Sequence, residues 1–138
     1  MRLALSSALM GLFMCISALA QGVSDAAPAI RDTIQRQVEA FLRDDFAAAF
    51  EYAAPNIRTL FGTPENFGAM VRNGYPMVWR PDGVQFGPLE EINGVLWQTV
   101  LFRDGNGIVH AMGYRMVQTD GDWRISAVQR LPQPDPSV

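Results

Sequence analysis

A few side chains in this sequence have the chemistry to move a proton. Asp44 and Asp45 are adjacent carboxylates in an otherwise apolar run, AFLRDDFAAAFEYAAP, and His110 is the single imidazole of the chain. Tyr114 adds a phenol four residues after the histidine. A general acid or base must reach its substrate by a hydrogen bond, in a cavity that brings its pKa near neutrality. One hypothesis is therefore a small hydrolase or isomerase, with His110 or Asp45 as proton carrier and Tyr114 orienting the substrate.

The place of the two aspartates in the helical pattern favours a structural role instead. The triplet Arg43-Asp44-Asp45 falls where one predicted helix ends and the next begins. Asp44 can then cap free backbone N–H groups, while Asp45 lies in the first turn, where the helix dipole favours negative charge. Each effect contributes about 0.5–1 kcal/mol. We expect helix capping rather than catalysis from this pair.

The first 20 residues have the pattern of a secretory signal peptide. Arg2 precedes an apolar stretch from about Ala8 to Ile16, and small residues at Ala18 and Ala20 suit a cleavage site. The apolar stretch is shorter than the roughly 20 residues that a membrane-spanning helix needs. We therefore expect export to the periplasm or the medium, cleavage after Ala20, and a soluble mature form without a stable membrane span.

The composition excludes several classes of partner and site. The 138 residues carry a formal net charge of −3, and every basic residue is an arginine, so we expect no nucleic-acid surface. Cleavage after Ala20 removes the only cysteine, Cys15, which leaves one histidine and no thiol. Neither a disulfide nor a zinc site of the Cys/His type can then form. We expect no metal and no cofactor, and stability from a packed core alone.

The periodicity predicts helices first and strands afterwards. A flexible lead over 21–28 precedes an amphipathic helix with Pro28 in its first turn, a second helix over 46–53, and an irregular turn over 55–62. A third helix is expected with Thr63 as N-cap, Pro64 in its first turn and Gly74 as its stop. Strands are predicted over 75–80, 83–87, 89–102, 108–118 and 123–131, with the third interrupted at Asn93-Gly94. Residues 29–131 thus read as one α+β domain, followed by an extended proline-rich tail over 132–138.

Two hairpin turns, at DGNG (104–107) and TDGD (119–122), set the predicted register. If Asp104 pairs with Gly107, Leu101 lies opposite His110, and one sheet face carries a set of apolar and aromatic residues. We expect this face to pack against the helices and to line an apolar cavity. The candidate ligand contacts on it are Trp97, Thr99, His110, Met112 and Tyr114. For His110 and Tyr114 the alternative is a purely structural role, as a hydrogen-bonded side chain and as half of an aromatic cross-strand pair.

Two long strings carry a family resemblance: QVEAFLRDDFAAAFEYAAPNIRTLFGTPENFGAMVRNGYPMVWRP and QTVLFRDGNGIVHAMGYRMVQTDGDWRISAV. Together they resemble the bacterial domain-of-unknown-function family numbered 4864, over about residues 30–131. That family looks like part of the nuclear-transport-factor-2-like, or SnoaL-like, superfamily. The resemblance implies helices packed on a strongly curved antiparallel sheet, a cone, and it implies no activity. No catalytic motif of the enzymes in that superfamily matches this sequence residue by residue.

Three functions from different classes follow as hypotheses. The first is a non-enzymatic binding module that holds a small apolar molecule between the helices and the sheet. The second is the hydrolase or isomerase described above. The third is an interaction domain that forms a homodimer through the outer sheet face, whose valines and Phe102 are more apolar than full exposure favours. A single histidine without a matched acid–base partner is thin support for chemistry, so binding or interaction ranks above catalysis.

Overall fold

The computed structural model describes residues 15–132. The first 14 residues of the predicted signal peptide and residues 133–138 of the predicted tail lie outside the described residues. The elements follow in the order α1 (Cys15–Leu42), α2 (Phe46–Glu51), α3 (Pro55–Phe61), α4 (Pro64–Gly74), α5 (Pro76–Trp79), β1 (Gly83–Ile92), β2 (Val95–Arg103), β3 (Val109–Thr119) and β4 (Asp122–Arg130). Helices precede strands along the chain, which confirms the predicted α+β class.

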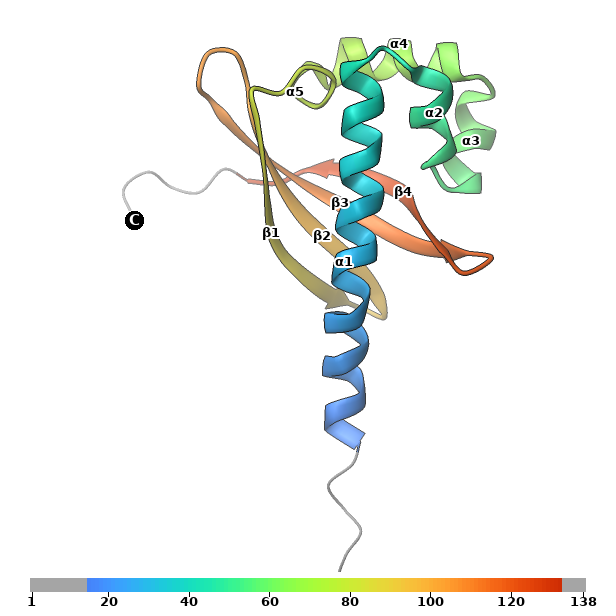
Figure 1. The fold of residues 1–138 in the computed structure, drawn as a ribbon, viewed down its shortest axis with the longest axis vertical. Coiled ribbons are helices and arrows are strands. Elements are labelled where there is room, and N and C mark those ends of the chain that lie inside the picture. The colour runs from blue at the N-terminus through green and yellow to red at the C-terminus, as the bar shows by residue number, and fades with distance from the viewer. Residues whose placement is uncertain (1–14, 133–138) are drawn as a thin grey trace, which may run out of the picture.

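The sheet is an open antiparallel meander rather than a cone. Its four strands follow one another in the order β1-β2-β3-β4, each paired with its neighbour in the chain. Figure 1 shows α1 lying across one face of this twisted sheet, with α2, α3 and α4 gathered near one end of the helix. The sheet is neither closed nor strongly curled, so the strong curvature expected from the resemblance was wrong.

Helix α1 begins well before the predicted start. Residues 21–28, expected to be a flexible lead, are helical, and Pro28 lies inside the helix rather than in its first turn. A proline inside a helix removes the hydrogen bond to the carbonyl four residues earlier. That carbonyl belongs to Ser24, and both Ser24 and Pro28 are exposed, so water can hydrate the unpaired oxygen. The apolar stripe itself was predicted correctly: Ile30, Ile34, Val38 and Phe41 are buried, although Leu42 is exposed.

Two short helices replace segments that were predicted otherwise. Residues 55–61 form α3 instead of an irregular turn, and residues 76–79 form α5 instead of the strand predicted over 75–80. In both, a proline occupies the first turn, Pro55 in α3 and Pro76 in α5. Proline suits that position because its fixed φ matches the helix and its missing N–H would have had no partner there. These two prolines therefore mark the starts of short helices.

Helices α2 and α4 pack closely at a glycine. Thr63 caps α4 as predicted, since its hydroxyl accepts a hydrogen bond from the Asn66 N–H at 3.2 Å. Gly68 is buried in the middle of α4, and a Cβ at this position would lie 2.6 Å from the Phe46 ring of α2. The absence of a side chain at Gly68 is what lets the two helices approach.

The turn between β2 and β3 is longer than predicted, and this changes the register. The Asp104 N–H donates to the Ile108 carbonyl at 2.9 Å, so the turn spans residues 104–108 instead of closing with Asp104 opposite Gly107. Phe102, rather than Leu101, therefore pairs with His110. A shift of one residue reverses the two faces of a strand. Gln98, Val100 and Phe102 consequently face the helices, all fully buried, and the prediction for the β2 faces was wrong.

Strand β4 begins in the predicted register and then bulges. Thr119 pairs with Asp122 and Met116 with Ile125, as expected, but Tyr114 pairs with Val128 instead of Ala127 because the ladder shifts between Arg115 and Met116. The free edge of β4 is also covered at this point. Ile125 exchanges backbone hydrogen bonds with the α2–α3 connection, from its N–H to the Tyr52 carbonyl and from the Ala54 N–H to its own carbonyl. Helix α3 is thereby held over the end of β4.

Candidate functional site

A pocket of about 280 Å³ lies between the helices and the inner face of the sheet. We call it the α3–α4 pocket, after the helices that supply much of its wall. Its lining comes from α1, the α2–α3 region, α4, α5, β3 and β4, and consists of Gln37, Phe41, Ala53, Ile57, Leu60, Phe61, Phe67, Met70, Val71, Tyr75, Val78, Tyr114, Ile125, Ser126, Ala127 and Val128. The lining contains no acidic or basic residue. Its few polar groups converge on an apolar interior, as in many small-molecule sites.

Helix α3 forms an incompletely packed wall of this pocket. It contributes Ile57, Leu60 and Phe61, yet no residue of α3 is fully buried, and Leu60 is 72% exposed. Exposed leucines are ordinary when scattered, but this one borders an apolar pocket. The helix is short and begins without a side-chain cap. Its apolar face is therefore available to a molecule that enters the pocket.

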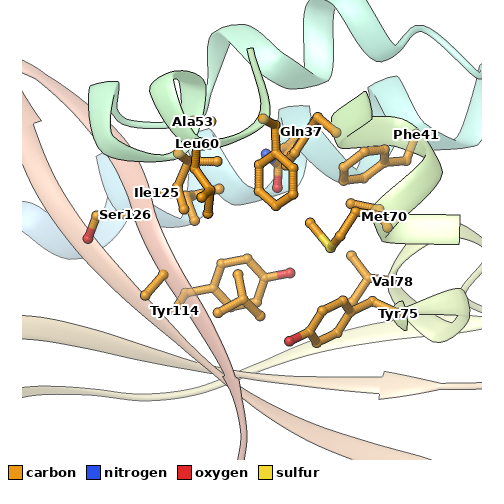
Figure 2. Close-up of a pocket in the computed structure, with 16 residues that line it drawn as sticks. Gln37, Phe41, Ala53, Leu60, Met70, Tyr75, Val78, Tyr114, Ile125 and Ser126 are labelled. Atoms are coloured by element: carbon orange, nitrogen blue, oxygen red, sulfur yellow. The ribbon is translucent and has the colours of Figure 1, made fainter. Parts of the chain in front are cut away.

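Tyr114 on β3 carries a buried hydroxyl without a hydrogen-bond partner in the described residues. The side chain is 0% exposed, and its ring packs against Phe102 with the centroids 6.2 Å apart. Burial, with a smaller effect of Tyr75, raises the pKa of Tyr114 far above its usual range, so the phenol stays protonated and remains a donor. Figure 2 shows the hydroxyl directed toward Met70 and Val78 at the pocket. An unpaired buried hydroxyl costs about 1–3 kcal/mol, so this group calls for an explanation.

Gln37 on α1 supplies a second polar group to the pocket. It is 4% exposed, and its amide nitrogen donates a hydrogen bond to the Ala49 carbonyl of α2 at 3.1 Å. This bond fixes the amide orientation, because only the NH₂ group can donate to a carbonyl. The amide oxygen consequently faces the pocket, as Figure 2 shows. The other polar residues of the lining are Tyr75 and Ser126, and the Ser126 hydroxyl already donates to the Arg115 carbonyl at 3.2 Å. Gln37 thus gives the α3–α4 pocket a fixed acceptor, and Tyr114 gives it a buried donor.

Arg130 of β4 holds the far side of the pocket in place. Its guanidinium lies 5.2 Å from the centre of the Tyr75 ring and donates a hydrogen bond to the Gly74 carbonyl at the end of α4. The contact joins a cation to an aromatic face and satisfies a carbonyl at a helix terminus. Through Tyr75, the arginine therefore positions the part of the lining where α4 passes into α5.

Of the five predicted ligand contacts, Tyr114 lies in the pocket and the other four do not. The changed register places Trp97 and Thr99 on the opposite sheet face, and Met112 is buried on the inner face outside the pocket lining. His110 lies near the β2–β3 turn, where its Nε2 is 2.8 Å from Asp104 Oδ2. The predicted cluster of five is therefore split among four parts of the molecule.

Asp104 explains why His110 belongs to the turn. Its other oxygen, Oδ1, accepts hydrogen bonds from the backbone N–H groups of Asn106 and Ile108 at 2.9 and 3.0 Å. The hydrogen bond from His110, helped by these backbone donors, holds the pKa of Asp104 below its usual range. Asp104 and His110 together brace the turn.

The aspartate pair has structural contacts, in an order that differs from the prediction. Asp45, not Asp44, is the N-cap of α2, and its carboxylate accepts from the Ala48 N–H at 3.1 Å. Asp44 has a φ of 54° and instead accepts hydrogen bonds from Trp79 Nε1 at 2.9 Å and Arg80 Nη2 at 2.8 Å. These donors, Trp79 first, hold the pKa of Asp44 below its usual range. Neither carboxylate lines the α3–α4 pocket.

Sequence reasoning missed three polar residues of the pocket, Gln37, Tyr75 and Ser126. A signal for Gln37 existed, because it lies three residues after Ile34 and four before Phe41, on the apolar stripe of its helix. A glutamine inside such a stripe is buried and must find partners. Tyr75 carried no such signal, since residues 75–80 were interpreted as a strand.

The outer sheet face is partly covered by its own side chains. Gly113 is buried there, and a Cβ at this position would lie 3.2 Å from Leu131 and 3.5 Å from the Trp97 ring. Trp97 of β2 and Leu131, the residue directly after β4, therefore pack across the glycine. The homodimer expected to form through this face stays a prediction.

Within residues 15–132, no helix is both long enough and apolar enough to cross a membrane. The same range contains no group of three or more His, Cys, Asp or Glu side chains placed to bind a metal ion.

Comparison with known proteins gives a family for this fold and pocket. A family model described as a domain of unknown function (DUF4864) matches residues 23–138. The chain belongs to this family. The match begins inside α1 and includes every residue of the α3–α4 pocket. Neither a curated protein nor a solved structure matched the chain. Membership in the wider nuclear-transport-factor-2-like superfamily stays a prediction.

Proposed function

We propose that this protein is an exported binding module that holds a small, mainly apolar molecule in the α3–α4 pocket. One observation carries the proposal: the fully buried hydroxyl of Tyr114, which has no hydrogen-bond partner among residues 15–132, beside a mainly apolar pocket. A core that serves only packing has little use for an unpaired phenol, since phenylalanine would fill the same volume without the desolvation cost. A ligand group that accepts the hydrogen bond offsets this cost.

The size and the walls of the pocket fit such a ligand. About 280 Å³ lies just below the range of roughly 300–1,000 Å³ for small-molecule sites, which suits a small ligand. The wall includes the flexible thioether of Met70 and the loosely packed helix α3, both of which can adjust to a guest. Binding would also bury part of the exposed surface of Leu60, which favours association.

The contacts of the proton carriers considered above favour binding over catalysis. Asp45 caps α2, and His110 pairs with Asp104 at the β2–β3 turn. Neither side chain lines the pocket beside Tyr114, so no acid–base pair faces a common substrate position.

Native mass spectrometry of protein purified from the periplasm of its own host tests the proposal. We expect a reproducible additional mass on the wild-type protein. Ile57→Trp should remove this mass, because the larger side chain fills the pocket from α3. Thr59→Trp is the matched control, since Thr59 is exposed on the same helix and outside the lining, and it should retain the ligand. Wild-type protein that never carries an additional mass would contradict the proposal.

The same spectra test the proposed export. Cleavage after Ala20 would give a mature chain that begins at Gln21, and the intact mass identifies that start. Full-length protein that remains in the cytoplasm would refute the export without affecting the binding proposal.

A further inference from the structure

We infer that the ligand is an uncharged molecule with a hydroxyl group, which accepts a hydrogen bond from Tyr114 and donates one to Gln37. This inference rests on the proposed function and adds the chemical class of the ligand to it.

Gln37 provides the hydrogen-bond acceptor that the pocket offers to the ligand. Its amide nitrogen is engaged with the Ala49 carbonyl, so the amide cannot rotate to present its NH₂ group without breaking a buried hydrogen bond. The pocket therefore presents the amide oxygen, which pairs with a donor on the ligand. A ketone or an ether could satisfy Tyr114 but would leave this oxygen facing an apolar group.

The donor side is the hydroxyl of Tyr114. It is buried and has no partner in the described residues, so its proton is free for an acceptor on the ligand. A single hydroxyl group both donates and accepts, which makes it the smallest group that is complementary to the two side chains.

The absence of charged residues from the lining disfavours ionised ligands. None of its residues is an aspartate, glutamate, lysine, arginine or histidine. A carboxylate or an ammonium group that entered would lose its hydration and meet no opposite charge, which is strongly unfavourable. At roughly 30 Å³ for each water-sized group, the pocket holds about nine non-hydrogen atoms.

Contact with Tyr114 requires a small local movement, because the side chain is 0% exposed. The hydroxyl points toward Met70, which is half-buried in the pocket wall (Figure 2). Methionine is unbranched and adapts readily to a guest. Displacement of the Met70 side chain is therefore the step that exposes the hydroxyl to the ligand.

A series of four probes of closely similar shape tests the class: 1-phenylethanol, acetophenone, cumene and benzoate. Binding is measured by NMR titration, with ¹³C-labelled methionine methyl groups as reporters. Met70 lines the pocket and should shift, whereas Met116 is buried outside the lining and serves as the internal control. We expect the alcohol to bind most tightly, the ketone about 3–10-fold more weakly, the hydrocarbon weaker again, and benzoate the weakest.

Two variants assign the preference to its residues. Tyr114→Phe should bring the ketone to the affinity of cumene and should weaken the alcohol, which keeps only its hydrogen bond to Gln37. Gln37→Met should bring the alcohol to the affinity of the ketone. If Gln37→Met does not fold, the relative affinities of the four probes for wild-type protein still test the ligand class.

Other outcomes overturn distinct parts of the account. Equal affinities for the alcohol and cumene, unchanged by Tyr114→Phe, would refute the hydroxyl inference and leave the apolar binding function standing. If benzoate binds most tightly of the four probes, the inference that the ligand is uncharged is wrong. If none of the four probes shifts the Met70 methyl group up to its solubility limit, the proposed function itself fails.

Discussion

The unpaired hydroxyl of Tyr114 predicts that Tyr114→Phe stabilises the empty protein while it weakens ligand binding. The substitution removes one buried oxygen that has no partner and keeps the ring, whose packing against Phe102 at 6.2 Å is unchanged. Leaving such a group unpaired costs about 1–3 kcal/mol, so the free energy of unfolding should rise by about 1 kcal/mol or more. Most single substitutions lower stability, which makes a rise a distinctive result.

Urea unfolding followed by circular dichroism measures this change. The protein is first unfolded and refolded so that no bound molecule contributes to its stability. With a slope of about 2 kcal/mol/M, a gain of about 1 kcal/mol moves the midpoint upward by roughly 0.5 M. Tyr75→Phe is the matched control, because the half-buried Tyr75 lines the same pocket, and it should change stability by less than about 0.5 kcal/mol. A loss of about 1 kcal/mol in Tyr114→Phe would refute the reasoning, since it would mean that ordered water already pairs with the hydroxyl.

Two further predictions concern the scaffold. Gly68→Ala should lower the free energy of unfolding by about 1–2 kcal/mol, because its Cβ would lie 2.6 Å from the Phe46 ring. The control is Gly74→Ala on the same helix, whose Cβ meets nothing within 4 Å, so this variant should be neutral or stabilising. Urea unfolding measures both changes. Equal effects would contradict the packing argument. The lowered pKa of Asp104 contributes stability that is present above the unfolded value of about 3.9 and is lost as the pH falls through the folded pKa. Between about pH 5 and pH 3, wild-type protein should therefore lose more stability than Asp104→Asn, which lacks the ionised partner of His110, and parallel curves would argue against this role.

The elements that the sequence predicted well are those in which one local pattern determines the outcome. The stripe through Ile30, Ile34, Val38 and Phe41 has the spacing of a helix face, and these residues are buried. The cap at Thr63 followed by Pro64 gave the start of α4, and the signal at Asn93-Gly94 fell on the β1–β2 turn, where both residues have positive φ.

The β2 faces could not be predicted because they depend on a single residue of turn length. DGNG is compatible with a tight turn or with the longer turn that the structure has, in which Asp104 pairs with Ile108. The side chain of Asp104 stabilises the longer form because it accepts hydrogen bonds from two backbone N–H groups and forms a third hydrogen bond with His110. The one-residue difference then moved Trp97 and Thr99 away from the predicted ligand site.

The sequence predicted the type of site, an apolar cavity, but only some of the residues that line it. An apolar cavity between the helices and the sheet was expected, and Tyr114 lies in the lining of the pocket that the structure has there. Its wall at Ile57 and Leu60 lies on α3, which was interpreted as an irregular turn, and Tyr75 was assigned to a strand. Short helices that begin at a proline have weak periodicity, so packing against the rest of the protein decides their structure.

A crystal structure of the protein as purified from its host, at a resolution that shows ordered water, would reveal whether the α3–α4 pocket holds a ligand. We expect connected electron density larger than a water molecule in this pocket, with an atom within hydrogen-bond distance of the Tyr114 hydroxyl. A pocket closed by the side chains of Met70 and Leu60, or one that contains separate waters alone, would contradict this expectation.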